Sequence, residues 1–544
     1  MSHSPVVRPI ASAALAITIA LSCGTAGAAD GAVDTTELAR QIEALRQTVV
    51  AQQAQIEALR QALERTQVAS VTAPTPAAAP ASPPAATSAA AAVEPSPTFA
   101  ATEAPRVTLA NGRPTITSAD GRNSLALRAI VQGDYGHYAQ AGAGSLATDF
   151  RRGSTGAAPN RETTAARDLS DGMYFRRARL GVEGVFNRDI GYRLVVDFGG
   201  SGTESTPKIS DAWINYTGFA PFAIQLGAFS PPANLDDGTT PEDSLFIERA
   251  TPADLSRSLG GADGRLGLGI RRSGARWMGA LTLTSRTVAD AEAFDTQRAL
   301  VGRVGGLVAT GESYNVHLGA SGTWVIDPVD SGPDTTGARH AIRFRAQPEL
   351  RVDSTRLIDT GPIDAKHAHA VGIEFGASWR NLFVQAERFD FGIDRANPAL
   401  RNPGFSGWYA EGSWILTGES RRYNPAAAAF QNPRPFVPVS RNGGFGAWEL
   451  ALRYSETDLD FLAGTEGLAT PVDGVRGGMQ RIWTVGVNWY LNANTRLMFN
   501  YLNIDVDRLN PSPTAFGAAP ASPPPGARIG QQLDAYALRM QYAF

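Results

Sequence analysis

Cysteine and lysine are almost absent from this chain of 544 residues. The single cysteine is Cys23, and lysine occurs only at Lys208 and Lys366, whereas the chain has 47 arginines. With one cysteine, neither a disulfide framework nor a cysteine-based metal site is expected. Because lysine is so rare, nearly every fixed cation is a guanidinium, which stays charged at neutral pH and presents a rigid fork of hydrogen-bond donors.

The chain also has no basic excess, because its formal net charge is -3 and its sequence pI is about 6.1. A general nucleic-acid binder would carry a clear basic excess, so we expect no nucleic-acid partner. The six histidines are scattered, and only His367 and His369 lie close together. On a strand such a pair shares one face, where it forms either a metal site or two polar residues at a strand end. We expect no resident metal or cofactor.

Long hydrophobic runs are missing as well. The apolar run 10–21 is too short to cross a bilayer as a helix, and no later stretch has 18 consecutive apolar residues. Arg8 before this run and the small residues 26–28 after it predict a cleaved export signal at residues 1–28. Cys23 leaves a lipoprotein signal as the alternative, although Leu21 is badly placed for one. An exported chain of this kind is either soluble or a β-barrel.

Residues 29–68 carry apolar residues spaced alternately by four and three, which predicts a coiled-coil helix with Thr36 as N-cap. A lone amphipathic helix is the alternative. Gln52 occupies a core position, and whether the coiled coil has two or three strands is left open. Residues 69–105 are mostly Ala, Pro, Ser and Thr, which is typical of a linker. The predicted core of the coiled coil is Leu38, Ile42, Leu45, Val49, Ile56, Leu59 and Leu63.

From 106 to 544 the pattern changes to short alternating runs, which is the strand period. For example, Trp448 and Leu450 alternate with Glu449 and Arg453. Aromatic residues end many apolar faces, and runs of ~9–11 residues match tilted membrane-spanning strands. We therefore predict an all-β protein: a transmembrane antiparallel β-barrel of about 16 strands. The candidate outer loops, one of which is expected to fold inward, are 139–172, 232–262, 326–340, 394–404, 423–443 and 506–530.

The last run of the sequence places aromatic and apolar residues on one strand face and finishes at Phe544. An aromatic residue closing an alternating strand resembles the signal that the outer-membrane assembly machinery reads. We therefore interpret Tyr542 and Phe544 as the assembly signal.

Several motifs together resemble the phosphate-selective porin O and P family, over about two-thirds of the chain from Phe175 to Phe544. These motifs are Phe175 to Gly181 with Gly184, Asp211 to Tyr216, Leu226 to Phe229, Phe246 to Arg249, Gly407 to Tyr409 with Trp414 to Glu419, Gly446 to Ser455 and Asn488 to Asn492. The resemblance implies a sixteen-stranded trimeric barrel, with a periplasmic coiled coil in some members. The chain departs from the family at Ser230, where a lysine is common. With two lysines it has no lysine cluster for phosphate.

Strand parity predicts which side chains line the lumen. Guanidinium groups at positions i and i+2 lie about 6.5–7 Å apart and would offer a ladder to phosphate or carboxylate. Inward acids, among them Glu183, Asp197 and Glu449, allow the alternative that arginine–carboxylate pairs only brace the barrel. The acidic group Asp236, Asp237, Glu242 and Asp243 is expected in a solvated loop, with a divalent-cation site as the alternative. The predicted pore-lining residues are Arg128, Arg177, Arg179, Arg193, Arg271, Arg276, Arg343, Arg345, Arg453, Arg496 and Arg539.

The sequence shows no catalytic motif, so we expect no enzyme activity. We predict an outer-membrane porin with a periplasmic N-terminal extension, in which small hydrophilic solutes diffuse passively and anions are preferred. Phosphate and polyphosphate are candidate solutes. The expected partners are further copies of the chain in a homotrimer, outer-membrane lipids and small anions. The alternatives are a non-selective porin and a structural outer-membrane protein tethered to the cell wall; a trimeric adhesin and a barrel hydrolase fit the sequence less well.

Overall fold

The computed structural model describes only part of the chain, and the described part belongs to one compact unit. The predicted export signal, the coiled coil with its core residues and nearly all of the linker lie outside it, so these three stay predictions. No helix in the described part is long and apolar enough to cross a membrane. The described residues are 104–110, 112–140, 169–200, 207–290, 293–511 and 525–544.

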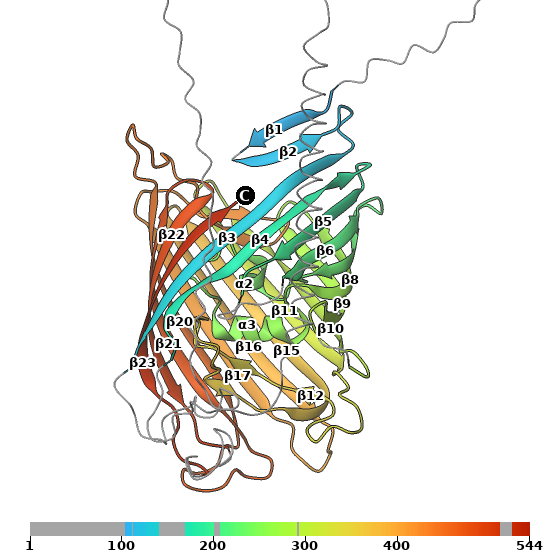
Figure 1. The fold of residues 1–544 in the computed structure, drawn as a ribbon, viewed down its shortest axis with the longest axis vertical. Helices are drawn as coiled ribbons and strands as arrows, with labels where there is room; N and C mark the ends of the chain where they lie inside the picture. The colour runs from blue at the N-terminus through green and yellow to red at the C-terminus, as the bar shows by residue number, and fades with distance from the viewer. Residues whose placement is uncertain (1–103, 111, 141–168, 201–206, 291–292, 512–524) are drawn as a thin grey trace, which may run out of the picture. The chain divides into compact units, whose positions relative to one another are not determined.

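Sixteen antiparallel strands close into a barrel (Figure 1). Each strand pairs with the next, and β23 returns to pair with β3, so that Arg539 lies opposite Asp134. The prediction of an all-β barrel of about 16 strands is therefore confirmed. The strands are β3 (Ser124–Ala139), β4 (Gly172–Phe186), β5 (Ile190–Asp197), β6 (Lys208–Tyr216), β7 (Ala223–Phe229), β8 (Arg265–Ser273), β9 (Trp277–Thr287), β10 (Arg298–Thr310), β11 (Tyr314–Asp327), β15 (Ile363–Trp379), β16 (Leu382–Arg395), β17 (Gly404–Ile415), β20 (Ala447–Phe461), β21 (Val475–Tyr490), β22 (Thr495–Asp507) and β23 (Gln532–Ala543).

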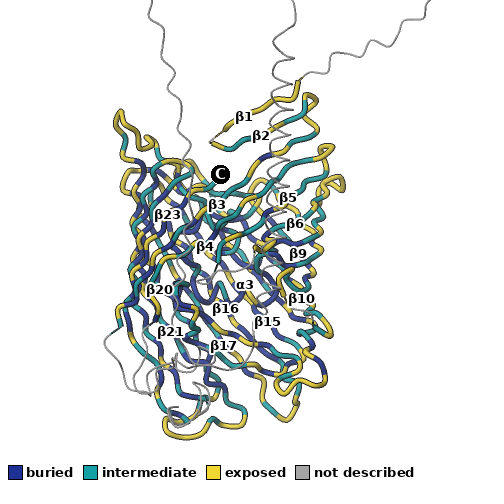
Figure 2. Tube along the Cα trace, in the orientation of Figure 1, coloured by how far each residue is buried: buried dark blue, intermediate teal, exposed yellow. Residues whose placement is uncertain are grey.

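Exposure alternates along the wall strands, as Figure 2 shows. In β20 the inward Glu449 and Arg453 are 0% and 3% exposed, whereas the outward Leu450 and Leu452 are 41% and 50% exposed. An apolar outer face suits lipid, where each backbone N–H and C=O must be paired within the protein. Closing the sheet satisfies this demand, because no strand of the wall is left with an open edge.

Aromatic side chains border the apolar outer face on two levels, as in transmembrane barrels. Trp448 and Trp489 stack with ring centroids 5.0 Å apart near the end where β20 starts. Tyr454 and Trp483 meet at 4.8 Å about halfway along β20 and β21. Tyr542 and Phe544 lie 5.6 Å apart beside the end of β23. Their role as an assembly signal stays a prediction.

The two ends of the barrel differ in their connections. At the end where β3 starts and β23 finishes, here the turn end, most connections are short, such as 187–189 and 380–381. A hairpin of β1 (Arg106–Ala110) and β2 (Arg113–Thr117) pairs with β3 at this end. The other end is the loop end. The prediction that 423–443 is an outer loop is wrong: neighbouring strands alternate in direction, which puts the connection between β17 and β20 at the turn end.

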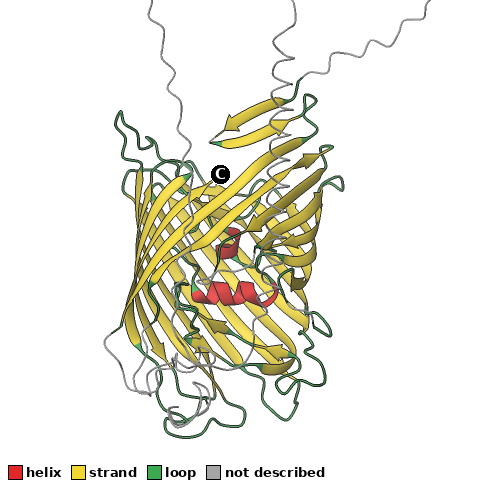
Figure 3. Cartoon of the chain, viewed as in Figure 1, coloured by secondary structure: helices red, strands yellow, loops and turns green. Residues whose placement is uncertain are grey.

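Residues 230–264, here the inward loop, fold from the loop end into the lumen and contain both helices of the described part of the chain (Figure 3). In α2 (Leu235–Gly238), the N-cap Asn234 side chain accepts a hydrogen bond of 2.7 Å from the Asp237 N–H. In α3 (Thr251–Gly260), a proline in the first turn suits a helix start, where its missing N–H has no intrahelical partner. α3 packs against β11, β16, β17 and β20.

Two further segments occupy the lumen on the β10–β23 side. Residues 328–362, the loop-end insert, contain β12 (Ala341–Ile342), β13 (Arg345–Ala346) and β14 (Ile358–Asp359). Their Phe344 and Leu350 share a buried apolar cluster with Leu255 of α3. Residues 416–446, the turn-end insert, contain β18 (Arg422–Asn424) and β19 (Ala429–Gln431). In this insert the Phe430 ring lies 4.9 Å from that of Phe383 on the wall.

We expect Glu387→Ala to loosen the inward loop without unfolding the barrel. The Glu387 carboxylate accepts hydrogen bonds from the Leu235 and Asp236 N–H groups at 2.8 and 3.0 Å and from the Tyr409 hydroxyl at 2.7 Å. Leaving a buried donor unsatisfied costs about 1–3 kcal/mol. The measurement is the rate of trypsin cleavage in the inward loop, together with heat-modifiable migration of the intact barrel.

The matched control is Val384→Ala on the outer face of the same strand, which should leave cleavage unchanged. Equal cleavage rates in both variants would show that Glu387 does not hold the loop.

Candidate functional site

Open space in the lumen lies between the inward loop and the wall formed by β3 to β9. A turn-end cavity has a water-accessible volume of about 310 Å³ and a loop-end cavity has one of about 250 Å³. The two cavities adjoin, because Arg179, Ser210, Arg249 and Asp263 line both of them. We call the two cavities together the passage and these four residues its neck.

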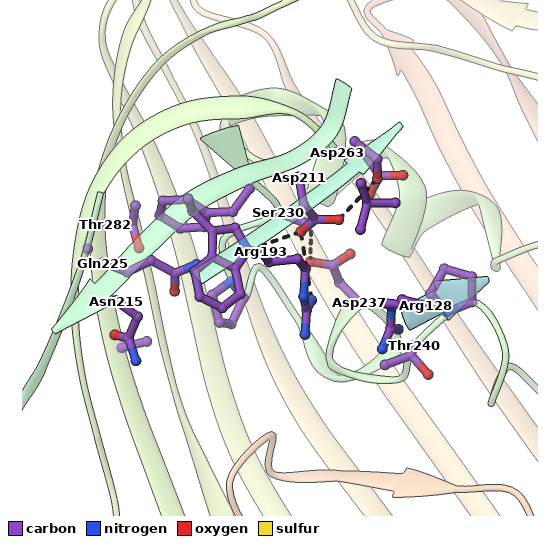
Figure 4. Close-up of a pocket in the computed structure, with 18 of the residues that line it drawn as sticks. Arg128, Arg193, Asp211, Asn215, Gln225, Ser230, Asp237, Thr240, Asp263 and Thr282 are labelled. Atoms are coloured by element: carbon purple, nitrogen blue, oxygen red, sulfur yellow. Dashed lines mark hydrogen bonds and ion pairs between the residues drawn. The ribbon is translucent and has the colours of Figure 1, made fainter. Parts of the chain in front are cut away.

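The turn-end cavity pairs arginines of the wall with nearby carboxylates (Figure 4). The Arg128 Nη2 atom lies 2.6 Å from Glu242 Oε1 of the inward loop. Arg193 lies 2.7 Å from Glu183 and 3.8 Å from Asp211, with its guanidinium 5.0 Å from the centroid of the Trp213 ring. Ion pairing and cation–π contact thus fix both side chains against the wall.

At the neck, positive and negative groups alternate. The Arg179 Nε–H donates to Asp197 Oδ2 at 2.8 Å, and the same guanidinium pairs with Asp263. Arg257 of α3 reaches Asp263 and Asp237. Asp197 joins two strands of the wall, Asp263 joins the wall to the inward loop, and Asp237 pairs within that loop, so the neck is held by charge-assisted hydrogen bonds.

Besides Arg179 of the neck, the loop-end cavity contains three arginines from β4 and the loop-end insert, Arg176, Arg177 and Arg351. Glu248 of the inward loop lies 2.5 Å from Arg176 Nε and 3.2 Å from Arg351 Nε. The neighbouring Arg177 has a different environment. It donates from Nη1 to the neutral Gln132 Oε1 at 2.7 Å, and its buried Nε has no hydrogen-bond partner. Within the described part of the chain, no carboxylate forms an ion pair with Arg177.

Basic groups outnumber acidic groups along the passage, with ten against seven. The excess corresponds to Arg177, Lys208 and Arg271, none of which forms an ion pair with a described carboxylate; Arg271 donates instead to the Ala426 carbonyl at 2.6 Å. Low-dielectric walls focus the field of such charges into the water between them. The basic groups are Arg128, Arg176, Arg177, Arg179, Arg193, Lys208, Arg249, Arg257, Arg271 and Arg351, and the acids are Asp197, Asp211, Asp237, Glu242, Glu248, Asp254 and Asp263.

The paired carboxylates of the inward loop are ionised at neutral pH. Burial alone would raise the pKa of Glu248, but the guanidiniums of Arg176 and Arg351 hold that pKa well below its usual range. Burial likewise opposes ionisation of Asp263, and Arg179 and Arg257 lower its pKa well below the ordinary value. These acids therefore neutralise their partners, and the unpaired cations supply the net charge.

The structure places eight of the eleven predicted pore-lining arginines on the inner face of the wall. Five of them, Arg128, Arg177, Arg179, Arg193 and Arg271, line the passage. Arg453 and Arg539 point inward but are buried beneath the inserted segments, and Arg496 lines a separate cavity at the turn end. Their predicted role in conduction stays a prediction.

Three of the predicted positions are wrong. Arg276 lies exposed in the turn between β8 and β9. Arg343 and Arg345 lie in the loop-end insert, where Arg343 pairs with Asp359, and not on a strand of the wall. The reason is that alternation reports only local extended backbone, whereas membership of the wall depends on pairing with distant strands.

Sequence reasoning missed four arginines of the passage: Arg176, Arg249, Arg257 and Arg351. Arg176 is the extra residue of a β-bulge, because Gln132 pairs with Arg177 while Gly133 pairs with Phe175. The bulge lets two consecutive arginines face inward. Adjacent arginines within an alternating strand are the local signal that could have found it. The other three lie in inserted segments that have no strand period.

The expectation that the acidic group 236–243 is a solvated loop is wrong. Asp236 and Asp243 are 7% and 8% exposed, and Asp237 and Glu242 pair with Arg257 and Arg128. The group acts as counter-charge to arginines. Among the described residues, no cluster of three or more His, Cys, Asp or Glu side chains is arranged to hold a metal ion.

The two neighbouring histidines lie on the outer face of β15. The His369 ring stacks on Trp324 with centroids 5.5 Å apart, and the His367 Nδ1 atom lies 2.8 Å from the Ile326 carbonyl oxygen. Both positions belong to the aromatic border of the barrel rather than to its lumen.

Comparison with known proteins gives consistent results. The chain is 26% identical over 490 residues to an uncharacterised protein of Caulobacter vibrioides, covering 87% of this chain and 86% of that protein. It is 24% identical to Porin O of Pseudomonas aeruginosa, covering 63% and 78%. An anion-selective porin from Comamonas acidovorans superposes with a TM-score of 0.43 at 12% identity, covering 78% and 100%. The model of one family matches residues 151–544, and the chain therefore belongs to the phosphate-selective porin O and P family.

Proposed function

We propose that this outer-membrane porin lets small hydrophilic anions diffuse passively along the passage. The observation that carries the proposal is the excess of three cations, Arg177, Lys208 and Arg271, that have no carboxylate partner among the described residues. Because the paired groups largely cancel, these three decide the sign of the field. An anion is attracted and a cation repelled as each enters the narrow wet space.

Oxyanions are the solutes best suited to this lining. A guanidinium presents donors in a planar fork that matches phosphate and carboxylate oxygens. Arg177 lines the loop-end cavity and is held in place by a neutral amide, so no described carboxylate cancels its charge toward a passing anion. Phosphate and polyphosphate are therefore the candidate solutes. With two lysines in the chain, recognition rests on arginine rather than on a lysine cluster.

The proposal includes the orientation and assembly of the barrel. The turn end, where the chain enters β3, faces the periplasm, and the predicted coiled coil is expected to be periplasmic. The apolar outer face and its aromatic borders match lipid, which supports insertion in the outer membrane. Assembly as a homotrimer is the expectation from the family. We propose no catalytic role.

A weakly selective general porin is the second candidate, and the seven acids along the passage favour it. If an arriving cation is stabilised by these acids as strongly as an anion is by the unpaired cations, selectivity is lost. The reversal potential in a salt gradient distinguishes the two candidates. A purely structural protein tethered to the cell wall would show no conductance.

Replacing Arg177 should lower anion preference with little disturbance of structure, because its one side-chain hydrogen bond to a described residue goes to neutral Gln132. In water a unit positive charge 4 Å away stabilises an anion and destabilises a cation by about 1 kcal/mol each, a combined difference of about 2 kcal/mol, so Arg177→Gln should lower the anion-to-cation permeability ratio about thirtyfold. Arg177→Glu should lower it further. The measurement is the reversal potential of single channels in a potassium chloride gradient.

Arg388→Gln is the control, since Arg388 lies on the outer face of β16 and is 52% exposed in its side chain. Charge loss there should leave the reversal potential at the wild-type value. If Arg177→Gln behaves like this control, Arg177 does not set selectivity.

Anion preference should be constant between pH 7 and pH 5. Burial would raise the pKa of Glu248 and Asp263, but their arginine partners lower it well below the ordinary range of about 4. Protonation of a carboxylate removes its negative charge and so raises anion preference. Glu248 and Asp263 would take up a proton only below this pH interval. Reversal potentials measured across this pH interval test the expectation. A steady rise in anion preference from pH 7 to pH 5 would show that the carboxylates are less strongly paired.

A further inference from the structure

A third cavity lies at the turn end, apart from the passage. It has a water-accessible volume of about 230 Å³ and is enclosed by the β1–β2 hairpin, the turn-end insert and the ends of β21, β22 and β23. Glu242 is the one lining residue that it shares with the turn-end cavity of the passage. We call it the mouth cavity.

Arg496 of β22 is the most buried cation of the mouth cavity, with 2% exposure. Its Nη1 donates to Asn432 Oδ1 at 3.2 Å and its Nη2 to Gln541 Oε1 at 3.3 Å, while its buried Nε has no partner. The guanidinium also lies 5.7 Å from the centroid of the Tyr490 ring. All these partners are neutral, and a buried charge without a counter-charge is costly.

Two more guanidiniums line the same cavity from the turn-end insert. Arg422 donates from Nε to the Asn432 carbonyl at 3.1 Å, and Arg434 is exposed. Asn432 therefore binds both Arg422 and Arg496, one through its carbonyl and one through its side chain. Among the described residues, none of the three arginines forms an ion pair with a carboxylate.

The other charged groups of the mouth cavity are already engaged. Arg113 pairs with Glu183, and Glu242 lies 2.6 Å from Arg128. Asp243 accepts hydrogen bonds from the Asn432 N–H at 3.0 Å and from the Thr240 hydroxyl at 3.0 Å. Burial and the nearby Glu242 raise the pKa of Asp243, which weakens it as a counter-charge. Among the described residues, the three positive charges of Arg422, Arg434 and Arg496 therefore face at most the single negative charge of Asp243, with which none of them forms an ion pair.

We propose that the mouth cavity binds a small soluble oxyanion of the phosphate type, with Arg496 at its base and Arg422 and Arg434 at its rim. A tetrahedral oxyanion offers several acceptor oxygens, so it can accept from three guanidiniums at once. A free solute fits better than a lipid headgroup, because Tyr490, Arg496 and Gln541 are buried on the lumen side of the wall. The site is distinct from the passage and does not depend on its selectivity.

Calorimetric titration of inorganic phosphate into the purified porin tests the site. The protein is kept in a maltoside detergent, which has no phosphate headgroup, and in low-chloride buffer. Arg434→Gln and Arg496→Gln should each weaken phosphate binding about tenfold, the size expected for one charge-assisted hydrogen bond. Arg434 is exposed, so its substitution tests the site even if Arg496→Gln prevents folding.

Two controls separate this site from its alternatives. Arg441→Gln removes a charge from the same insert but not from the cavity lining, and it should bind phosphate like the wild type. Arg177→Gln should also keep this binding, whatever it does to the reversal potential, so the two proposals can fail separately.

The proposal is overturned if Arg434→Gln binds phosphate as tightly as the wild type. It is also overturned if Arg441→Gln weakens binding equally, which would indicate general surface charge, or if only Arg177→Gln does, which would place the anion in the passage. Binding that appears only with phosphatidylglycerol vesicles would identify a lipid headgroup instead.

Discussion

Ion pairs between arginines of the wall and carboxylates of the inward loop determine where the lumen stays open. Breaking a buried pair by removing one partner typically costs 3–5 kcal/mol, because the other charge is left uncompensated. The loop is therefore held against β3, β4 and β23 while apolar contacts of α3 fill the opposite side. The passage between the loop and the strands from β3 to β9 is the space that remains. These pairs are Arg128–Glu242, Arg176–Glu248, Arg179–Asp263 and Arg539–Glu248.

Because of this pairing, the number of arginines in the lumen does not measure how strongly the lumen attracts anions. A guanidinium engaged by Glu248 or Asp263 contributes structure, and its charge is largely cancelled at a distance. Arg177 contributes to the field because Gln132, an amide, stands where a carboxylate would otherwise compensate it. The sequence left open whether the arginines brace the barrel or attract anions. On β4 these two roles belong to different arginines.

Much of the barrel was predictable, because lipid outside and water inside impose a period of two on each wall strand. That period identified strands such as β20 and β21 and the inward direction of Arg128 and Arg193. It could not show what covers an inward side chain, so Arg453 and Arg539 were expected in water and are buried. It also placed Arg343 and Arg345 on the wall, although their extended segment pairs within the loop-end insert. Long-range pairing and inserted segments leave no periodic signal.

Guanidinium groups in this lumen hold several partners at once in a fixed geometry. Arg539 is an example. Its Nε lies 2.7 Å from one carboxylate oxygen of Asp134 and its Nη2 lies 2.7 Å from the other, while its Nη1 donates to the Ile247 carbonyl. One side chain thus joins β23, β3 and the inward loop in a fixed geometry. A lysine ammonium has no planar fork, so it would not reproduce the bidentate contact with Asp134 while also reaching the Ile247 carbonyl. At Ser230, where the family resemblance led us to expect a lysine, the nearby Arg257 donates from Nη2 toward the Ser230 hydroxyl oxygen at 3.4 Å. In this chain, guanidinium groups therefore both hold the inward loop to the wall and supply the positive charge of the lumen.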